Sequence, residues 1–535
     1  MTPVKINACF GIVHGDQSWP TGIILLPGLR SDELHGYDGL RQMAESFAEN
    51  NYPTLRFHYA STGNSLDAGE QEYWSYWKAN IHEAINWLIR TYQVKGVILV
   101  GLRFGSLLAA SIAAERNDIA GLILLQPIWR GRSYLSRLVV EMHAEADKPI
   151  PMGRFYFSLA TRKILQDLAL QNMTPPKHCR VLILSTDSGS TLTSVTNIWQ
   201  AAGVDVTTQP MAQLDFMLRP TFNNDEERPD MTCLIDWIGP STHDSEPVNL
   251  KQDCVLEGAH FSETPLVFGE DDLFGILCTP KQPVSRTVVL MGNASADPHC
   301  SASTVGLARQ LAAQGIYSLR FDFAGIADSV HDNQHTHIFA VPRAADFAQA
   351  ADKLFSLGFE RFATQGLCSG AYHAYHGAMG YKRINAVLAI NMPFFEWVPG
   401  PLEYLDFNVR PPSALLEQVK TKEFWRNVVY KATHNEINYK HYIGMALHKV
   451  LRRPNGMRQV AEMPHVHMQF LCGETDKSRS VLAEAFSPRP PSQIEIVVMS
   501  DLNHAMTTAA MWASVAIQMA AFLTQETVEP SSEMR

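Results

Sequence analysis

Apolar and polar positions follow a repeated order along the chain. A short apolar run such as residues 21–26 is followed by a glycine-containing loop and then by a segment such as 37–51, in which apolar residues recur every three or four positions. The first pattern is typical of buried strands and the second of amphipathic helices. Because strands alternate with helices, the pattern predicts parallel β-α-β units in a doubly wound sheet flanked by helices, an α/β fold.

The same order of elements occurs twice. The similar pairs are TGIILLPG (21–28) with TVVLMG (287–292), LRFH (55–58) with LRFD (319–322), and LVGLRFG (99–105) with TQGLCSG (364–370). The glycines at 28 and 292 are 264 residues apart (292 − 28), and positions 103 and 368 are 265 apart (368 − 103). A nearly constant separation over such a stretch predicts a tandem duplication.

The length of 535 residues also fits two domains. We expect a first domain at 1–240, a linker at 241–255, a second domain at 256–527 and a flexible tail at 528–535, because residues 239–253 are polar and contain proline and glycine. Charged residues make up only 18% of the chain, which indicates large buried cores. We therefore expect the two domains to pack against each other as an internal pseudo-dimer.

Charge and cysteine content limit the class of protein. The net charge of −10 argues against a nucleic-acid partner. The eight cysteines are scattered without a CxxC or zinc spacing, which is typical of reduced thiols in a cytoplasmic protein. The N-terminal residues lack the layout of a signal peptide, and the most apolar stretch, 96–114, is interrupted by Arg103 and by glycines. We expect a cytoplasmic location and no membrane span.

Histidines cluster at 331–337, at His373 and His376, and at 463–468. None of these clusters combines with carboxylates or cysteines at the spacing of a known metal site, so we expect no metal and place these histidines on loops or at the mouth of a site. The chain has no P-loop, and its glycine-rich turns lack GxGxxG, so we expect no cofactor.

The second half contains Gly366-Leu367-Cys368-Ser369-Gly370 between an apolar strand and a helix of small residues. This arrangement resembles the nucleophile elbow of the α/β-hydrolases. The resemblance implies two tandem α/β-hydrolase domains, the second with a larger helical cap formed by the insertion at about 393–464. A cysteine at the apex is similar to the dienelactone hydrolases, the polyester synthases and some thioesterases.

The family order of nucleophile, acid and histidine is met by Cys368, Asp476 and His504. The resemblance implies that His504 takes the thiol proton and that Asp476 orients the imidazole. The alternatives are that Cys368 is a buried small hydrophobic residue and that Ser369 is the nucleophile. If Cys368 is the apex, the backbone N–H of Ser369 belongs to the oxyanion hole, and the second donor comes from the loop near Asn293 and Ala294.

The first half departs from this pattern. Arg103 stands at the apex of its elbow, Asp215 stands at the histidine position, and only Asp187 is retained. Because a guanidinium is not a nucleophile at neutral pH, we expect a degenerate domain in which Arg103 pairs with Asp215 or Asp187. The arginine then either fills space or forms an anion site. Residues 126–142, QPIWRGRSYLSRLVVEM, resemble hydrolases associated with exosortase systems.

The insertion at 393–464 contains ten Lys and Arg against seven Asp and Glu. It is either a solvated charged face or a docking surface for an anionic partner such as phosphopantetheine, coenzyme A, an acyl carrier protein or a lipid headgroup.

The function that these features predict is hydrolysis of an ester or thioester through a covalent acyl-enzyme. The alternatives are acyltransferase, cyclase or thioesterase action on acyl chains bound to a carrier or coenzyme A, and an inactive scaffold protein. The expected partner is a small-molecule or carrier-bound acyl substrate.

Overall fold

The computed structural model describes residues 1–17, 19–69, 71–145, 147–186, 189–210, 218, 231–239, 247–248, 250, 254–293, 298–329, 338–339, 341–397, 420–422, 425–426 and 456–525. Most of the expected linker, most of the insertion at 393–464, the histidines at 331–337 and the tail at 528–535 lie outside these ranges. The chain divides into two compact units. Unit 1 contains Met1–Pro265, Ser295–Gly306 and Ile326–Asp328, and unit 2 contains Leu266–Ala294, Leu307–Gly325 and Ser329–Arg535.

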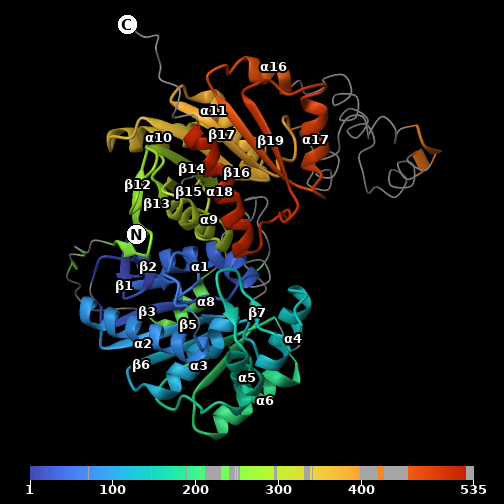
Figure 1. The fold of residues 1–535 in the computed structure, drawn as a ribbon. Helices are drawn as coiled ribbons and strands as arrows, with labels where there is room; N and C mark the ends of the chain where they lie inside the picture. The colour runs from blue at the N-terminus through green and yellow to red at the C-terminus, as the bar shows by residue number, and fades with distance from the viewer. Residues whose placement is uncertain are drawn as a thin grey trace. The chain divides into compact units, whose positions relative to one another are not determined.

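Within the described ranges, the first sheet has eight strands in the order β1-β2-β4-β3-β5-β6-β9-β10 (Figure 1). Its strands are β1 (Thr2–Ile6), β2 (Cys9–His14), β3 (Thr21–Leu26), β4 (Thr54–Phe57), β5 (Gly96–Leu102), β6 (Ile119–Leu125), β9 (Arg180–Leu184) and β10 (Val206–Gln209). Strands β1 and β2 form an antiparallel hairpin, and β2 pairs antiparallel with β4. All other neighbours are parallel, so the loops after β3, β5, β6 and β9 meet at one edge.

Helices cover both faces of this sheet. They are α1 (Ser31–Glu49), α2 (Tyr73–Tyr92), α3 (Phe104–Glu115), α4 (Gly131–Glu141), α5 (Leu159–Asp167), α6 (Ser190–Ala201) and α8 (Thr232–Ile238), with a short hairpin of β7 (Ile150–Pro151) and β8 (Tyr156–Phe157) and a 3-10 turn at Leu170–Asn172. Successive residues of β3 point to opposite faces. Ile24 packs in a core with α2 and α3, and Ile23 packs in a second core with α1 and α8. The sheet is therefore doubly wound, as the sequence predicts.

Local sequence signals explain where some helices begin. The Glu72 carboxylate caps α2 by accepting hydrogen bonds from the backbone N–H groups of Trp74 (2.8 Å) and Ser75 (3.1 Å). At the start of α5, Ser158 Oγ accepts a hydrogen bond from the N–H of Thr161 (3.1 Å). These side chains satisfy backbone donors that the first turn of a helix leaves without a partner.

The second sheet repeats the strand order of the first. In the part of the chain that the structure describes, its nine strands lie in the order β11-β12-β13-β15-β14-β16-β17-β18-β19. They are β11 (Leu256–Glu257), β12 (Phe261–Phe268), β13 (Leu273–Pro280), β14 (Thr287–Asn293), β15 (Tyr317–Asp322), β16 (Arg361–Leu367), β17 (Ile384–Ile390), β18 (His467–Gly473) and β19 (Ile494–Met499). Strands β14 to β19 are parallel, and β13 pairs antiparallel with β15. Strands β13, β15, β14, β16, β17, β18 and β19 thus correspond to β2, β4, β3, β5, β6, β9 and β10.

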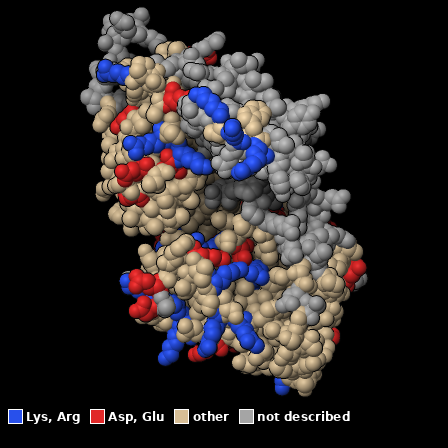
Figure 2. All heavy atoms as spheres, turned by 90° about the vertical axis from the view of Figure 1, so that its right-hand side faces the viewer, with Lys and Arg blue, Asp and Glu red and all other residues tan. Residues whose placement is uncertain are grey.

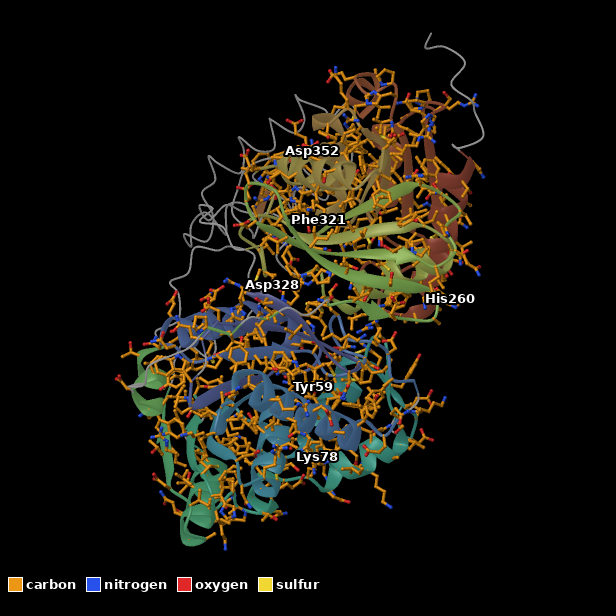
Figure 3. The ribbon with its side chains drawn as sticks, turned by 90° about the vertical axis from the view of Figure 1, so that its left-hand side faces the viewer. Tyr59, Lys78, His260, Phe321, Asp328 and Asp352 are labelled. Carbon is orange, nitrogen blue, oxygen red and sulfur yellow. The ribbon has the colours of Figure 1, made fainter. Side chains whose placement is uncertain are left out.

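The described helices beside this sheet are α9 (Ala302–Ala313), α10 (Ala344–Ser356), α11 (Ser369–Gly380), α16 (Gly456–Ala461), α17 (Ser478–Ala485) and α18 (Ala509–Gln525). Aromatic rings attach α10 to the sheet. Phe321 of β15, labelled in Figure 3, lies edge-on to Phe347 of α10 with ring centroids 5.5 Å apart, and Phe323 lies 5.4 Å from the same ring. Such edge-to-face pairs stabilise beyond their buried area. Two mostly parallel sheets flanked by helices confirm the α/β fold class.

The surface carries charges of both signs. On the face drawn in Figure 2, Lys and Arg lie among Asp and Glu and a larger uncharged area. Among the helices that the structure describes, none is both long enough and apolar enough to cross a lipid bilayer.

Candidate active site

The sharp turn between β16 and α11 places Cys368 at the edge of the second sheet where parallel strands end. Its backbone has φ 52° and ψ −110°, a conformation with positive φ that L-residues rarely adopt. The backbone is held there because the N–H of Cys368 donates to the carbonyl of Ile390 (2.9 Å) and its own carbonyl accepts from the N–H of Tyr372 (3.2 Å). Backbone strain that the surroundings maintain is typical of functional sites.

The glycines of the elbow allow strand and helix to touch. A Cβ on Gly366 would lie 2.0 Å from the carbonyl carbon of Gly370, which no folded backbone tolerates. Among the described residues, a Cβ on Gly370 would have the carbonyl oxygen of Gly292 as its neighbour, at 3.4 Å. The elbow therefore requires glycine strictly at position 366 and less strictly at position 370.

His504 and Asp476 form a hydrogen-bonded pair beside this elbow. His504 Nδ1 donates to Asp476 Oδ2 over 2.7 Å, and the other carboxylate oxygen accepts from the N–H of Ser478 (2.8 Å). Burial by itself would raise the pKa of Asp476, but the hydrogen bonds from Ser478 and His504 outweigh it and hold that pKa below its usual value. Asp476 is therefore ionised at neutral pH and fixes the tautomer of the imidazole.

The imidazole also reaches the elbow. A hydrogen bond with the Cys368 side chain is the largest cause that raises the pKa of His504, to about 9, and Asp476 raises it further. Because Nδ1 is occupied by Asp476, Nε2 is the nitrogen left for the sulfur. The structure thus brings together the three residues that the sequence proposed for the site, in the order Cys368, His504, Asp476.

Asn391 is a site residue that the sequence reasoning missed. It follows β17, is fully buried and has φ 48°. Its Nδ2 donates to the backbone carbonyls of Asn503 (3.1 Å) and His504 (3.0 Å), and its Oδ1 accepts from the N–H of Gly473 (3.0 Å). One side chain therefore joins the histidine loop to the loop that carries Asp476. The available signal was a polar residue directly after the apolar run 386–390, at the edge where the other site residues lie.

The expected oxyanion donors are placed in part. Ser369 is the first residue of α11, so its N–H belongs to the free donors of the helix N-terminus. The side-chain amide of Asn293 donates to the carbonyls of Met291 (3.1 Å) and Phe321 (3.0 Å). These bonds link the ends of β14 and β15. Ala294 lies outside the described residues, so the second donor stays a prediction.

The elbow of unit 1 has the same backbone. Arg103 has φ 53° and ψ −112°, within 2° of the values at Cys368. Its Nε lies 3.4 Å from Oδ2 of Asp32, in the first turn of α1. The partners that the sequence suggested, Asp187 and Asp215, are not among the residues that the structure describes, so those pairings stay predictions.

The expectation that His373 and His376 lie on loops or at the mouth of the site was wrong. Both are on α11, where Nε2 of His373 donates to the carbonyl of Ile338 (2.7 Å) and Nε2 of His376 donates to that of Phe395 (3.0 Å). Burial lowers the pKa of His373 to about 3 and that of His376 to about 4, so both are neutral packing residues. No group of three or more His, Cys, Asp or Glu within the described ranges is arranged to hold a metal ion.

Comparison with known proteins finds solved structures that align with about half of the chain. No protein-family model matches the chain, and no curated protein matches it. The Pyrococcus furiosus esterase Pf2001 aligns over 50% of this chain and 93% of its own, with 15% identity and a TM-score of 0.32. The esterase domain of a Rhodothermus marinus protein aligns over 49% and 98%, with 16% identity and a TM-score of 0.31. TM-scores and identities this low say nothing about chemistry, so the roles below rest on the geometry of the residues.

Proposed function

We propose that unit 2 hydrolyses an ester or thioester through an acyl-enzyme on Cys368. The observation that carries this proposal is a cysteine on a positive-φ elbow that lies close enough to His504 to raise the pKa of the imidazole, and His504 is in turn hydrogen-bonded to Asp476. A nucleophile, a base and a group that orients the base, each within hydrogen-bond reach of the next, are the parts that nucleophilic catalysis needs.

Because the pKa of His504 is raised to about 9, Nε2 of the imidazole already holds the proton at neutral pH. In the first step the sulfur of Cys368, with its proton on His504, forms a bond with the substrate carbonyl carbon. The carbonyl electrons move to its oxygen, which the N–H of Ser369 faces at the start of α11. The N-terminal end of α11 also favours negative charge on the sulfur. When the oxyanion collapses, the alcohol or thiol leaves with the proton from His504, and an acyl thioester remains on Cys368.

In the second step neutral His504 takes a proton from a water molecule, whose oxygen attacks the acyl carbon. Collapse of the second oxyanion breaks the carbon–sulfur bond, releases the carboxylic acid and restores the Cys368–His504 pair with the proton on His504. The ionised Asp476 stabilises the imidazolium that forms in both steps. His504 has 57% of its side-chain surface exposed, so water has access to the base. This access favours hydrolysis over transfer to another acceptor.

The test uses a panel of p-nitrophenyl esters and acyl-coenzyme A thioesters. Cys368→Ala should lower kcat by about 10³-fold or more while the fold is retained, because the nucleophile is lost. The matched control is Cys472→Ala, which removes a buried thiol from β18 in the same unit and should leave kcat within a few-fold of the wild type. Intact-mass analysis of quenched reactions should find the acyl adduct on the wild type and not on Cys368→Ala.

Turnover by Cys368→Ala near the wild-type rate would contradict the assignment, and loss of activity on Ser369→Ala alone would move the nucleophile to Ser369. A substrate panel on which the wild type forms neither product nor adduct would favour the scaffold alternative. Addition of a primary alcohol or amine separates the remaining cases, since a transferase forms the new ester or amide and a hydrolase forms only the acid.

We also propose that the two units arose by tandem duplication and that unit 1 has lost the chemistry. The shared strand order and the matching elbow backbones support this proposal. A guanidinium at the apex has no lone pair available for attack on a carbonyl at neutral pH.

A further inference from the structure

The elbow of unit 1 presents a cation where unit 2 presents a nucleophile. A Cβ on Gly101 would lie 2.6 Å from the carbonyl oxygen of Gly105, and a Cβ on Gly105 would lie 2.2 Å from the carbonyl oxygen of Leu26. The strand, the helix and β3 are therefore in direct contact, and the side chain at position 103 has to project over the N-terminus of α3. The N-terminus of α3 and the guanidinium are both positive, so this position attracts an anion from solvent.

Two further arginines stand near this position. Arg137 of α4 donates from Nη2 to Oδ2 of Asp32 over 2.9 Å, so Arg103 and Arg137 share one carboxylate oxygen. Arg137 Nε also lies 3.4 Å from Glu141, and Arg30 stands at the start of α1 beside the same group of charges. Three guanidinium groups thus face two carboxylates, which leaves a net positive charge among these described residues.

Tyr134 supplies an independent sign that a partner is missing. Its side chain is 2% exposed, and its hydroxyl has no hydrogen-bond partner within the described part of the chain. The ring packs against Phe104 of α3, with centroids 5.2 Å apart, and Arg137 lies over it at 5.3 Å. Burial, and then the negative charge of Asp32, raise the pKa of Tyr134 far above its usual value, so the hydroxyl keeps its proton. A buried hydroxyl without an acceptor is unfavourable, and a bound acceptor would recover that free energy.

We propose that this position, the apex of the unit 1 elbow, binds a small oxyanion, a carboxylate or phosphate group, through the N–H donors of Arg103 and Arg137 that Asp32 leaves unused, with Tyr134 as a neutral donor. Planar guanidinium groups suit both anions because each offers parallel N–H donors to two oxygens. The side chains are within reach of solvent, since Arg103 is 18% and Arg137 36% exposed. The proposal concerns unit 1 alone and does not depend on catalysis by unit 2.

The experiment is calorimetric titration of the full-length chain with sodium phosphate and, separately, sodium butyrate at constant ionic strength. We expect the wild type to bind phosphate, butyrate or both. If it binds only one of them, that anion identifies the ligand as a phosphate or as a carboxylate. Arg103→Met should weaken binding about tenfold or more, as expected for loss of a charge-assisted pair. Arg132→Met is the matched control, because Arg132 is an exposed arginine on the same helix as Arg137 and should leave the affinity unchanged.

Tyr134→Phe tests the proposal without disturbing a known contact. Because the hydroxyl has no described partner, this variant should keep or raise the Tm without anion and should bind the anion several-fold more weakly than the wild type. Equal affinity in the wild type, Arg103→Met and Tyr134→Phe would overturn the proposal. Binding by Asp215→Asn but not by the wild type would also overturn it, since an internal carboxylate would then occupy the place of the anion.

Discussion

At the scale of residues, a single side-chain amide sets the position of His504, the proposed base. Asn391 bonds two carbonyls of the His504 loop and one N–H of the loop before Asp476, so it fixes both members of the pair from one buried point. Gln126 occupies the matching place in unit 1, where its backbone N–H donates to Leu184 as that of Asn391 does to Leu471. Among the described residues, its side chain exchanges two hydrogen bonds with Thr186, each of 2.9 Å. The two positions therefore offer a matched comparison.

Asn391→Gly should lower kcat for ester hydrolysis by about 10–100-fold with a small change in KM, because the base moves while the substrate pocket stays. Glycine tolerates φ 48°, so the loss reports the amide and not the backbone. Gln126→Gly should leave both constants unchanged. Steady-state kinetics and chemical denaturation of both variants check this, and equal losses in the two variants would contradict the positioning role.

The titration of His504 should depend on Cys368. The hydrogen bond from the protonated imidazole to the Cys368 sulfur is the largest cause of a pKa of about 9, so Cys368→Ala should move the midpoint towards the ordinary value of 6.5. NMR of labelled histidines, assigned with His504→Asn, measures the midpoint directly. A midpoint that is the same in both proteins would mean that the imidazole does not contact the sulfur.

The raised pKa of His504 also makes the stability of the fold depend on pH, and the direction of this dependence follows from linkage. A pKa raised in the folded state means that the folded protein binds the proton more tightly than the unfolded chain does. The stabilisation is complete below about pH 6.5 and is lost as the pH rises through about 9. Cys368→Ala should therefore flatten the fall in Tm between these two pH values.

At the scale of elements, the elbow is a contact between a strand and the helix that follows it. Gly366→Ala should destabilise unit 2 by about 2–4 kcal/mol, because its Cβ meets backbone atoms at 2.0 Å and the helix has to move away. Gly370→Ala should cost much less, because its Cβ meets one oxygen at 3.4 Å. Urea denaturation of the two variants measures the difference, and equal destabilisation would mean that the packing at position 366 relaxes freely.

The sequence was informative about elements because strands and helices leave a local pattern. The elbow at Cys368 was predictable since its glycines, apolar strand and small-residue helix are contiguous in sequence. The proximity of Asp32 to Arg103 was not predicted, because only Asp187 and Asp215, at the positions of the acid and the histidine, were expected as partners. It depends on β3 and β5 being neighbours with a common edge, which is a property of the sheet. His373 was misplaced for a related reason, since a buried histidine and a loop histidine look the same in sequence.

At the scale of the whole molecule, unit 1 is not one continuous stretch. It includes Ile326–Asp328, and Asp328, labelled in Figure 3, is fully buried there in an ion pair with Arg56 at 2.6 Å. Tyr37 donates a second hydrogen bond to the same carboxylate (2.5 Å). Burial alone would raise the pKa of Asp328, but the pairing with Arg56 holds it well below its usual range.

Asp328→Asn should destabilise unit 1 by about 3–5 kcal/mol, because Arg56 would remain as a buried charge without its counter-ion. Asp352→Asn is the control, since Asp352 is exposed and accepts a hydrogen bond from Tyr381 (Figure 3). The stabilisation from Asp328 is present above the ordinary pKa of 3.8 and is lost at lower pH, so the two variants should converge in acid. Calorimetric unfolding checks this, and a Tm equal to that of the control at pH 7 would contradict it.

The position of Asp328 in the sequence also determines when, during synthesis of the chain, Arg56 can form its ion pair. The carboxylate that Arg56 requires is synthesised 63 residues (328 − 265) after the main stretch of unit 1 ends at Pro265. At about 5–20 residues per second the ribosome needs roughly 3–13 s to cover that distance. Arg56 stays without this partner for that interval, and slow translation between positions 265 and 328 lengthens it. The pace at which the second half is made therefore controls when the first half is finished.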